Sequence, residues 1–272
     1  MSDDLKKILG ALAPYLPDIV IIGGWVPQLY RLYGGVPWRT VTSRTTELDV
    51  LVEPKLDPAG RPKIRDLLEA IRVRPARREA FPADWVSEES EATVVEFIME
   101  NPGPAMTKSP QLVELQSPLG AIVLNDVAML RTFSGILTVR IDDESWELRV
   151  PTLGAWAVGK ALSFGARRGN AVSRSGADKR AKDLVYLRDV LYAGPEVLAQ
   201  VTNDLKAVAA SRAGQLAMKR AIGHLKTEHE DTLVGAMLQL STRDNAPAAT
   251  ARAEIAGAEQ FFLELLSEHI SA

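Results

Sequence analysis

The stretch Ile21-Ile22-Gly23-Gly24-Trp25 is followed, after a helix-length gap, by Thr46-Glu47-Leu48-Asp49-Val50-Leu51-Val52-Glu53, and these two segments decide the fold. The first predicts an apolar strand that ends in two glycines and opens a helix. The second predicts a strand with two carboxylates two positions apart. Because side chains alternate faces along a strand, Glu47 and Asp49 are expected to point the same way, roughly 6–7 Å apart.

Two carboxylates at this separation suit a divalent metal, because hard oxygen ligands can share one Mg²⁺ or flank a pair of them. Gly23 and Gly24 allow a phosphate to approach the backbone closely, and the free N–H groups of the following helix point toward the anion. Either motif alone is common in proteins: a glycine pair before a helix as an ordinary turn, and an acidic–apolar–acidic strand as a solvated sheet face. Their combination in this order favours a site for a phosphate and its metal.

Composition limits the classes of function. The chain has 272 residues, 46% hydrophobic residues, a net charge of −3, three histidines and no cysteine. Disulfides, thiol catalysis and Cys-ligated zinc are excluded, and serine-triad and zinc-hydrolase chemistry have little support. No apolar run reaches the roughly 18–20 residues of a membrane helix. The N-terminus is acidic and lacks a signal-peptide layout. We therefore expect a cytoplasmic protein with no membrane partner.

The periodicity predicts an α+β protein: an N-terminal α/β lobe with a small mixed sheet over residues 1–150, and an all-helical lobe over residues 151–272. A basic run, Arg72–Arg78, is interpreted as solvated surface, or else as a phosphate or nucleic-acid contact. The expected strands are 18–22, 46–53, 92–99, 112–116 and a hairpin of 137–141 with 146–150. The expected helices are 4–14, 24–33, 61–73, 152–165, 178–193, most of 195–240, and 249–270.

With these motifs the chain resembles the nucleotidyltransferase-fold proteins of the DNA polymerase β superfamily. It is most similar to their abortive-infection toxin-like group, called AbiEii-type. The superfamily pattern is an apolar strand, a glycine pair, a helix and an acidic–apolar–acidic–apolar strand, here Ile21–Gly24 and Glu47–Val50. In this group an Arg and a Ser or Thr precede the acidic pair, as Arg44, Thr45 and Thr46 do here.

The resemblance continues along the chain to about residue 190. A third carboxylate is expected within an apolar–acidic–aromatic–apolar strand, which matches Val95-Glu96-Phe97-Ile98. Glu114 lies in a similar local pattern and is the competitor for this position. The group also has a Lys on the first helix after the sheet, here Lys160, and a basic segment that opens the next helix, here Lys179-Arg180-Ala181-Lys182-Asp183-Leu184.

The resemblance implies that a nucleoside monophosphate passes from an NTP to an acceptor and that pyrophosphate leaves. It implies that Glu47, Asp49 and Glu96 are the catalytic and metal-binding residues, with Mg²⁺ or Mn²⁺ as cofactor. The amides of Gly23 and Gly24 would hold phosphates, and Arg44 or Thr45 would add a contact. Lys160 and Lys182 would offset the triphosphate charge, and Asp183 would orient Lys160 or the nucleotide.

The acceptor stays open between RNA such as tRNA, a protein and a small molecule. A toxin role, with an antitoxin protein as partner, follows only from the resemblance. Glu47 and Glu96 stand where the family usually has Asp, and this departure favours an alternative: a catalytically silent fold that binds NTP without turnover. An aminoglycoside-type modifier of small cationic molecules is a further alternative, favoured weakly by the net negative charge.

Overall fold

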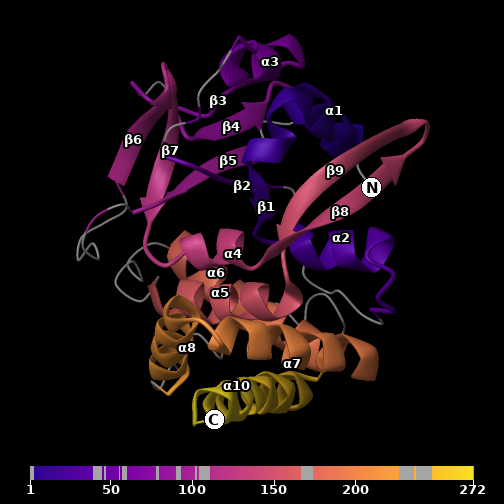
Figure 1. Ribbon diagram of the computed structural model, residues 1–272, viewed down its shortest axis with the longest axis vertical. Coiled ribbons are helices and arrows are strands. Elements are labelled where there is room, and N and C mark those ends of the chain that lie inside the picture. The colour runs from indigo at the N-terminus through magenta and orange to yellow at the C-terminus, as the bar shows by residue number, and fades with distance from the viewer. Residues whose placement is uncertain are drawn as a thin grey trace. The chain divides into compact units, whose positions relative to one another are not determined.

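The computed structural model describes residues 3–38, 45, 47–54, 56, 60–77, 80–89, 93–101, 103, 111–166, 174–226, 236 and 247–271 (Figure 1). The chain divides into two compact units. The first consists of Met1–Gly34 and Thr45–Pro151, and the second of Gly35–Arg44 and Thr152–Ala272. The functional boundary expected near Pro151 stays a prediction.

A mixed sheet forms the centre of the first unit, and the strand β5 is its branch point (Figure 1). Along one edge β5 pairs in parallel with β2, which pairs antiparallel with β1. Along the other edge, the first half of β5 pairs with β4 and the second half pairs with β7. β3 then pairs with β4, and β6 pairs with β7. The strands are β1 (Val20–Ile22), β2 (Leu48–Val52), β3 (Val73–Pro75), β4 (Asp84–Ser87), β5 (Thr93–Glu100), β6 (Gln111–Gln116) and β7 (Leu119–Leu124).

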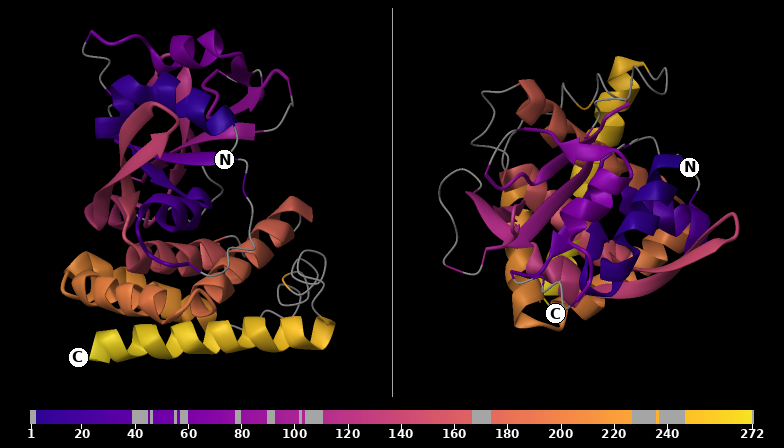
Figure 2. Two further views of the ribbon diagram at one scale, coloured as in Figure 1. Left: turned by 90° about the vertical axis from the view of Figure 1, so that its right-hand side faces the viewer. Right: turned by 90° about the horizontal axis from the view of Figure 1, so that it is seen from above.

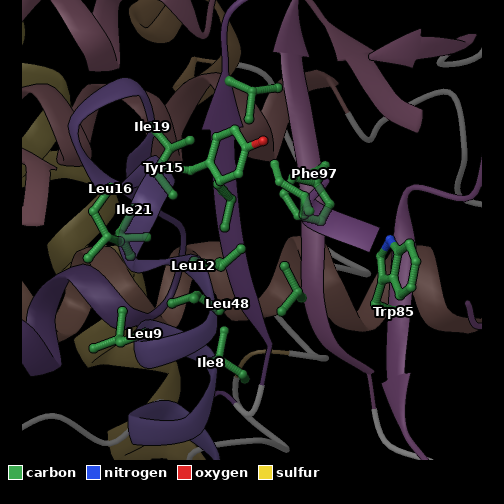
Figure 3. Close-up of a cluster of buried hydrophobic side chains, with 14 of the residues drawn as sticks. Ile8, Leu9, Leu12, Tyr15, Leu16, Ile19, Ile21, Leu48, Trp85 and Phe97 are labelled. Atoms are coloured by element: carbon green, nitrogen blue, oxygen red, sulfur yellow. The ribbon is translucent and has the colours of Figure 1, made fainter. Parts of the chain in front are cut away.

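One face of this sheet carries the main core of the first unit. Leu48, Val50 and Phe97 on this face join one buried cluster with apolar side chains of α1 (Asp3–Leu12), of the 3₁₀-helix η1 (Ala13–Asp18) and of α3 (Ile64–Ala70) (Figure 3). Tyr15 is fully buried, and its hydroxyl donates to Pro62 O at 2.8 Å. Because side chains alternate along β2, Asp49 lies on the opposite face from this core.

The remaining elements of the first unit are two helices and a hairpin. α2 (Trp25–Tyr33) follows β1, and the Tyr30 hydroxyl donates to Pro151 O at 3.1 Å. The short helix α4 (Ala128–Thr132) begins at a carboxylate, since Glu100 Oε2 accepts the amide hydrogens of Val127 and Ala128. Burial raises the pKa of Glu100, although these amides favour its charged form. β8 (Ser134–Ile141) and β9 (Glu144–Pro151) form the hairpin.

The described secondary structure of the second unit after Thr152 consists of helices joined by short turns (Figure 2). α5 is almost wholly apolar because it packs against α6, α7 and α8 at once. Gly154 permits the close approach of α7, since a Cβ there would collide with Asp204 and the α7 backbone. α10 packs along α6, α7 and α8. The helices are α5 (Leu153–Ala166), α6 (Arg174–Leu191), α7 (Pro195–Ala209), α8 (Arg212–Leu225) and α10 (Ala248–Ser271).

Glu259 on α10 makes the stability of this unit depend on pH. Burial raises its pKa to about 7 from the ordinary 4.5. The folded state therefore holds the proton more tightly, and stability falls as the pH rises from about 4.5 to 7. We expect Glu259→Gln to leave stability unchanged near pH 4.5 and to raise the free energy of unfolding by about 1–2 kcal/mol near pH 8, a range reduced for the group's partial exposure.

Urea unfolding at both pH values tests this expectation. Glu268→Gln is the matched control, because Glu268 is an exposed carboxylate on the same helix. A stability gain in Glu259→Gln that is equal at both pH values, or one that the control reproduces, would contradict it.

The expected fold class is confirmed: a mixed α/β sheet in the N-terminal part and helices in the C-terminal part. The helical pattern expected over most of 195–240 is present in the described residues as two helices, since α7 ends at Ala209 and α8 begins after Ser211, whose Oγ accepts the Gly214 amide at 2.9 Å. One local expectation is wrong: the acidic strand begins at Leu48, so Glu47 precedes it. Among the described helices, none combines the length and the apolar character needed to span a membrane.

Candidate active site

A tight glycine turn joins β1 to α2 at the predicted phosphate cradle. Gly23 has φ +71°, a conformation that suits glycine, and Gly24 occupies the N-cap position of α2 with a helical φ of −77°. A Cβ on Gly23 would fall inside the carboxylate of Asp49. The Asp49 side chain therefore packs directly against the bare backbone of the turn, as the two sequence motifs together require.

The sheet places Asp49 and Glu96 side by side. Asp49 on β2 is in register with Ile22 on one side and with Glu96 of the parallel strand β5 on the other. Register partners on neighbouring strands point to the same face, and such strands are about 4.8 Å apart. Both carboxylates are partly exposed. The two acidic side chains thus lie on the sheet face opposite the main core, next to the glycine turn.

Glu47 and its neighbours are only partly described. Glu47 lies just before β2 and is partly exposed, and its carbonyl oxygen accepts a hydrogen bond from Thr45 Oγ1 at 3.2 Å. The Thr45 hydroxyl proton is therefore used locally, whereas its oxygen can still accept. Arg44 and Thr46 lie outside the described residues. The predicted roles of Glu47, Arg44 and Thr45 stay predictions.

The two candidates for the third carboxylate differ in their position in the sheet. Glu114 lies on β6 in register with Gly120 of β7, and it is exposed. β7 and β5 separate β6 from β2, so Glu114 is distant in strand order from Asp49. Glu96 is the direct neighbour of Asp49 and is the residue that the geometry favours.

A carboxylate that the sequence reasoning missed lies beyond Glu96. Asp84 on β4 is in register with Glu96, which continues the row from β2 through β5 to β4 on the same face. Its Oδ1 is buried and has no hydrogen-bond partner among the described residues. A buried carboxylate oxygen without a partner is costly, and a cation or a protonated ligand would satisfy it. The signal was hidden because β4 itself was not predicted.

These residues fit a magnesium ion in the manner usual for nucleotide enzymes. Mg²⁺ is commonly held by one or two carboxylates and completed by substrate phosphates and water. Asp49 and Glu96 supply such a pair beside the glycine turn. Within the described part of the chain, no three His, Asp or Glu side chains gather closely enough to form an all-protein metal cage. A metal at this pair of carboxylates stays a prediction.

The basic residues predicted to contact a nucleotide lie in the second unit. Lys160 Nζ is 3.3 Å from Asp183 Oδ1, and the side chains are 12% and 1% exposed. Lys160 Nζ also lies 4.5 Å from the centre of the Tyr186 ring, and Lys182 Nζ lies 5.7 Å from it. The structure thus brings together all three predicted residues of this group, and Asp183 forms an ion pair with Lys160. Their contact with a nucleotide stays a prediction.

Comparisons with known proteins bear on the identity of this site. A family model described as "Nucleotidyltransferase" matches residues 4–211. A search of curated proteins gave no match. A solved structure, "Crystal structure of putative nucleotidyltransferase from H. pylori", is similar at 12% identity over 98% of each chain, with a TM-score of 0.42, a likeness too weak to carry an argument. Because the family match spans well over half of the sequence, the chain belongs to the nucleotidyltransferase family.

Proposed function

We propose that the protein transfers a nucleoside monophosphate from an NTP to an acceptor and releases pyrophosphate, with Mg²⁺ or Mn²⁺ as cofactor. The observation that carries the proposal is the juxtaposition of Asp49 with Glu96 and with the Gly23 turn. Membership of the nucleotidyltransferase family supports nucleotidyl transfer in general. The nature of the metal and the products of the reaction are the finer part of the proposal.

Each residue has a role that its position allows. Asp49 and Glu96 hold the metal, and Glu47 contributes from the segment before β2. The amides at Gly23 and Gly24 donate to phosphate oxygens, since they lie at the start of α2. When bound, divalent ions supply charge neutralisation for the triphosphate. Glu96 is assigned to the acceptor side, where a carboxylate can accept the proton of the attacking hydroxyl.

The charged residues of the second unit have a supporting role in the proposal. Lys160 and Lys182 offset the negative charge of the triphosphate, which is the use that phosphoryl-transfer enzymes make of lysine. Asp183 acts as a positioning residue through its contact with Lys160. Arg44 and Thr45 are assigned a phosphate contact on the sequence pattern alone.

The biological setting is proposed on the sequence resemblance only. Assignment to the AbiEii-type group, a toxin role and an antitoxin partner rest on the residues before Glu47 and on the Lys179–Leu184 segment. RNA, a protein and a small molecule are the acceptor classes to test. A silent NTP-binding module is the second candidate, favoured by the position of Glu47 outside β2.

Label transfer from each α-³²P-labelled NTP tests the proposal. The protein is incubated with Mg²⁺ or Mn²⁺ and with total RNA, a protein extract or a set of aminoglycosides. Labelled acceptor that needs the metal and disappears with a chelator supports transfer and identifies the acceptor class. Metal-dependent NTP binding in calorimetry without any labelled product would support the silent module instead. An absence of both binding and transfer would refute the phosphate-cradle interpretation of Gly23 and Gly24.

A further inference from the structure

A second site lies in the first unit, away from the carboxylate row. A hollow of about 770 Å³ lies between α3, β3 and β4 and is lined by residues that include Arg65, Arg74, Arg77 and Trp85. This volume is within the roughly 300–1,000 Å³ of ligand sites. All charged residues among the described residues that line the hollow are arginines. The lining therefore favours an anionic ligand.

The three arginines of the hollow come from a basic stretch of the sequence. Residues 61–78 contain seven basic and two acidic residues, a net charge of +5 in a chain whose net charge is −3. Arg74 and Arg77 are exposed, so their guanidinium groups are accessible to a large ligand. Arg65 Nε donates to Glu69 at 2.7 Å, which orients the guanidinium and leaves four of its five N–H donors for other acceptors.

The rest of the described lining is apolar. Apart from the three arginines, it consists of an alanine, three prolines and Trp85. Trp85 is fully buried, so its indole N–H is not offered to a ligand. The guanidinium groups are therefore the groups by which the described lining can recognise an anion.

We infer that this arginine hollow binds the phosphodiester backbone of a single-stranded nucleic acid. A free NTP fits less well, because it brings a metal that is usually held by one or two carboxylates, and no carboxylate is among the described residues that line the hollow. A phosphodiester chain carries one charge per phosphate and is bound mainly by Lys and Arg. The assignment of a polynucleotide as the acceptor rests on the proposed transfer reaction. The binding of a strand in the hollow does not depend on that reaction.

Fluorescence anisotropy with labelled RNA and DNA strands of about 12 nucleotides tests the inference. The titrations use the full chain with EDTA and without NTP, so they are independent of catalysis. We expect Arg74→Ala/Arg77→Ala to weaken binding about tenfold at about 50 mM salt. Loss of two phosphate contacts should also make the slope of log K against log salt shallower by about 1.4.

The matched control is Arg140→Ala/Arg149→Ala, which removes the same charge from exposed positions on the β8–β9 hairpin. Circular dichroism confirms that each variant is folded. Tighter binding of RNA than of DNA would identify RNA as the source of the backbone.

Three results would overturn the inference. Equal weakening in the hairpin control would show only diffuse electrostatics. Displacement of the strand by equimolar tripolyphosphate, or equally tight binding of a polyglutamate peptide, would show a site for anions of another class. No strand binding by the wild type would also refute it, whereas label transfer to a small acceptor in the earlier assay would leave the proposed reaction intact.

Discussion

Asp49→Asn is expected to reduce nucleotidyl transfer by about 10³-fold or more. Asp49 occupies the position between Ile22 and Glu96, and its carboxylate packs against Gly23. Asn keeps the size and shape of the side chain but removes its negative charge. A neutral amide binds Mg²⁺ weakly in comparison with a carboxylate, so the charge of the triphosphate would remain uncompensated.

Initial rates of label transfer at saturating metal measure this effect. Glu114→Gln is the matched control, since it removes one carboxylate from an exposed position on β6 of the same sheet and should keep wild-type activity. Thermal unfolding should show that both variants are as stable as the wild type within about 1 kcal/mol. Wild-type activity in Asp49→Asn, or an equal loss in Glu114→Gln, would remove Asp49 from the site.

Gly23→Ala is expected to destabilise the first unit by about 2–4 kcal/mol and to remove activity with it. Two causes act at this position. The φ of +71° disfavours any residue with a Cβ, and that Cβ would also collide with the Asp49 carboxylate. The second cause forces Asp49 away from the proposed metal site, so surviving folded protein should also be inactive.

Gly60→Ala separates these two causes. Gly60 has φ +80°, and a Cβ there would meet no atom of the described residues within 4 Å, so only the backbone penalty of about 1–2 kcal/mol is expected. Urea unfolding measures both variants, and label transfer is measured under conditions in which each remains folded. If Gly23→Ala and Gly60→Ala lower the free energy of unfolding equally and both variants stay active, the contact between Gly23 and Asp49 is not needed for activity.

The part of the site that the sequence could predict is local. Gly23, Gly24 and Asp49 lie in segments whose conformations follow from glycine and from apolar alternation. Glu96 could be predicted because Phe97 and its apolar neighbours mark a buried strand. The geometry agrees with both, since Asp49 and Glu96 are register partners.

The strands that the sequence did not reveal, β4 and β7, depend on contacts between distant parts of the chain. β4 is short, and a bulge between Trp85 and Val86 breaks the alternation that would have revealed Asp84. β7 contains Gly120, which weakens a strand pattern, but a Cβ there would collide with Phe81 O. Such a requirement is visible only when the neighbouring segment is in place.

The division of the chain into units separates the synthesis of one segment from the synthesis of the residues that it packs against. Residues 35–38 come between α2 and β2 in sequence, yet they belong to the second unit, where Trp38 is 5% exposed and lies edge-on to Trp156 at 6.5 Å. A ribosome therefore releases Trp38 long before its aromatic partner exists. If the chain were made as two separate pieces divided between Pro151 and Thr152, the N-terminal piece would expose Trp38. The C-terminal piece would lack Trp38 in its core.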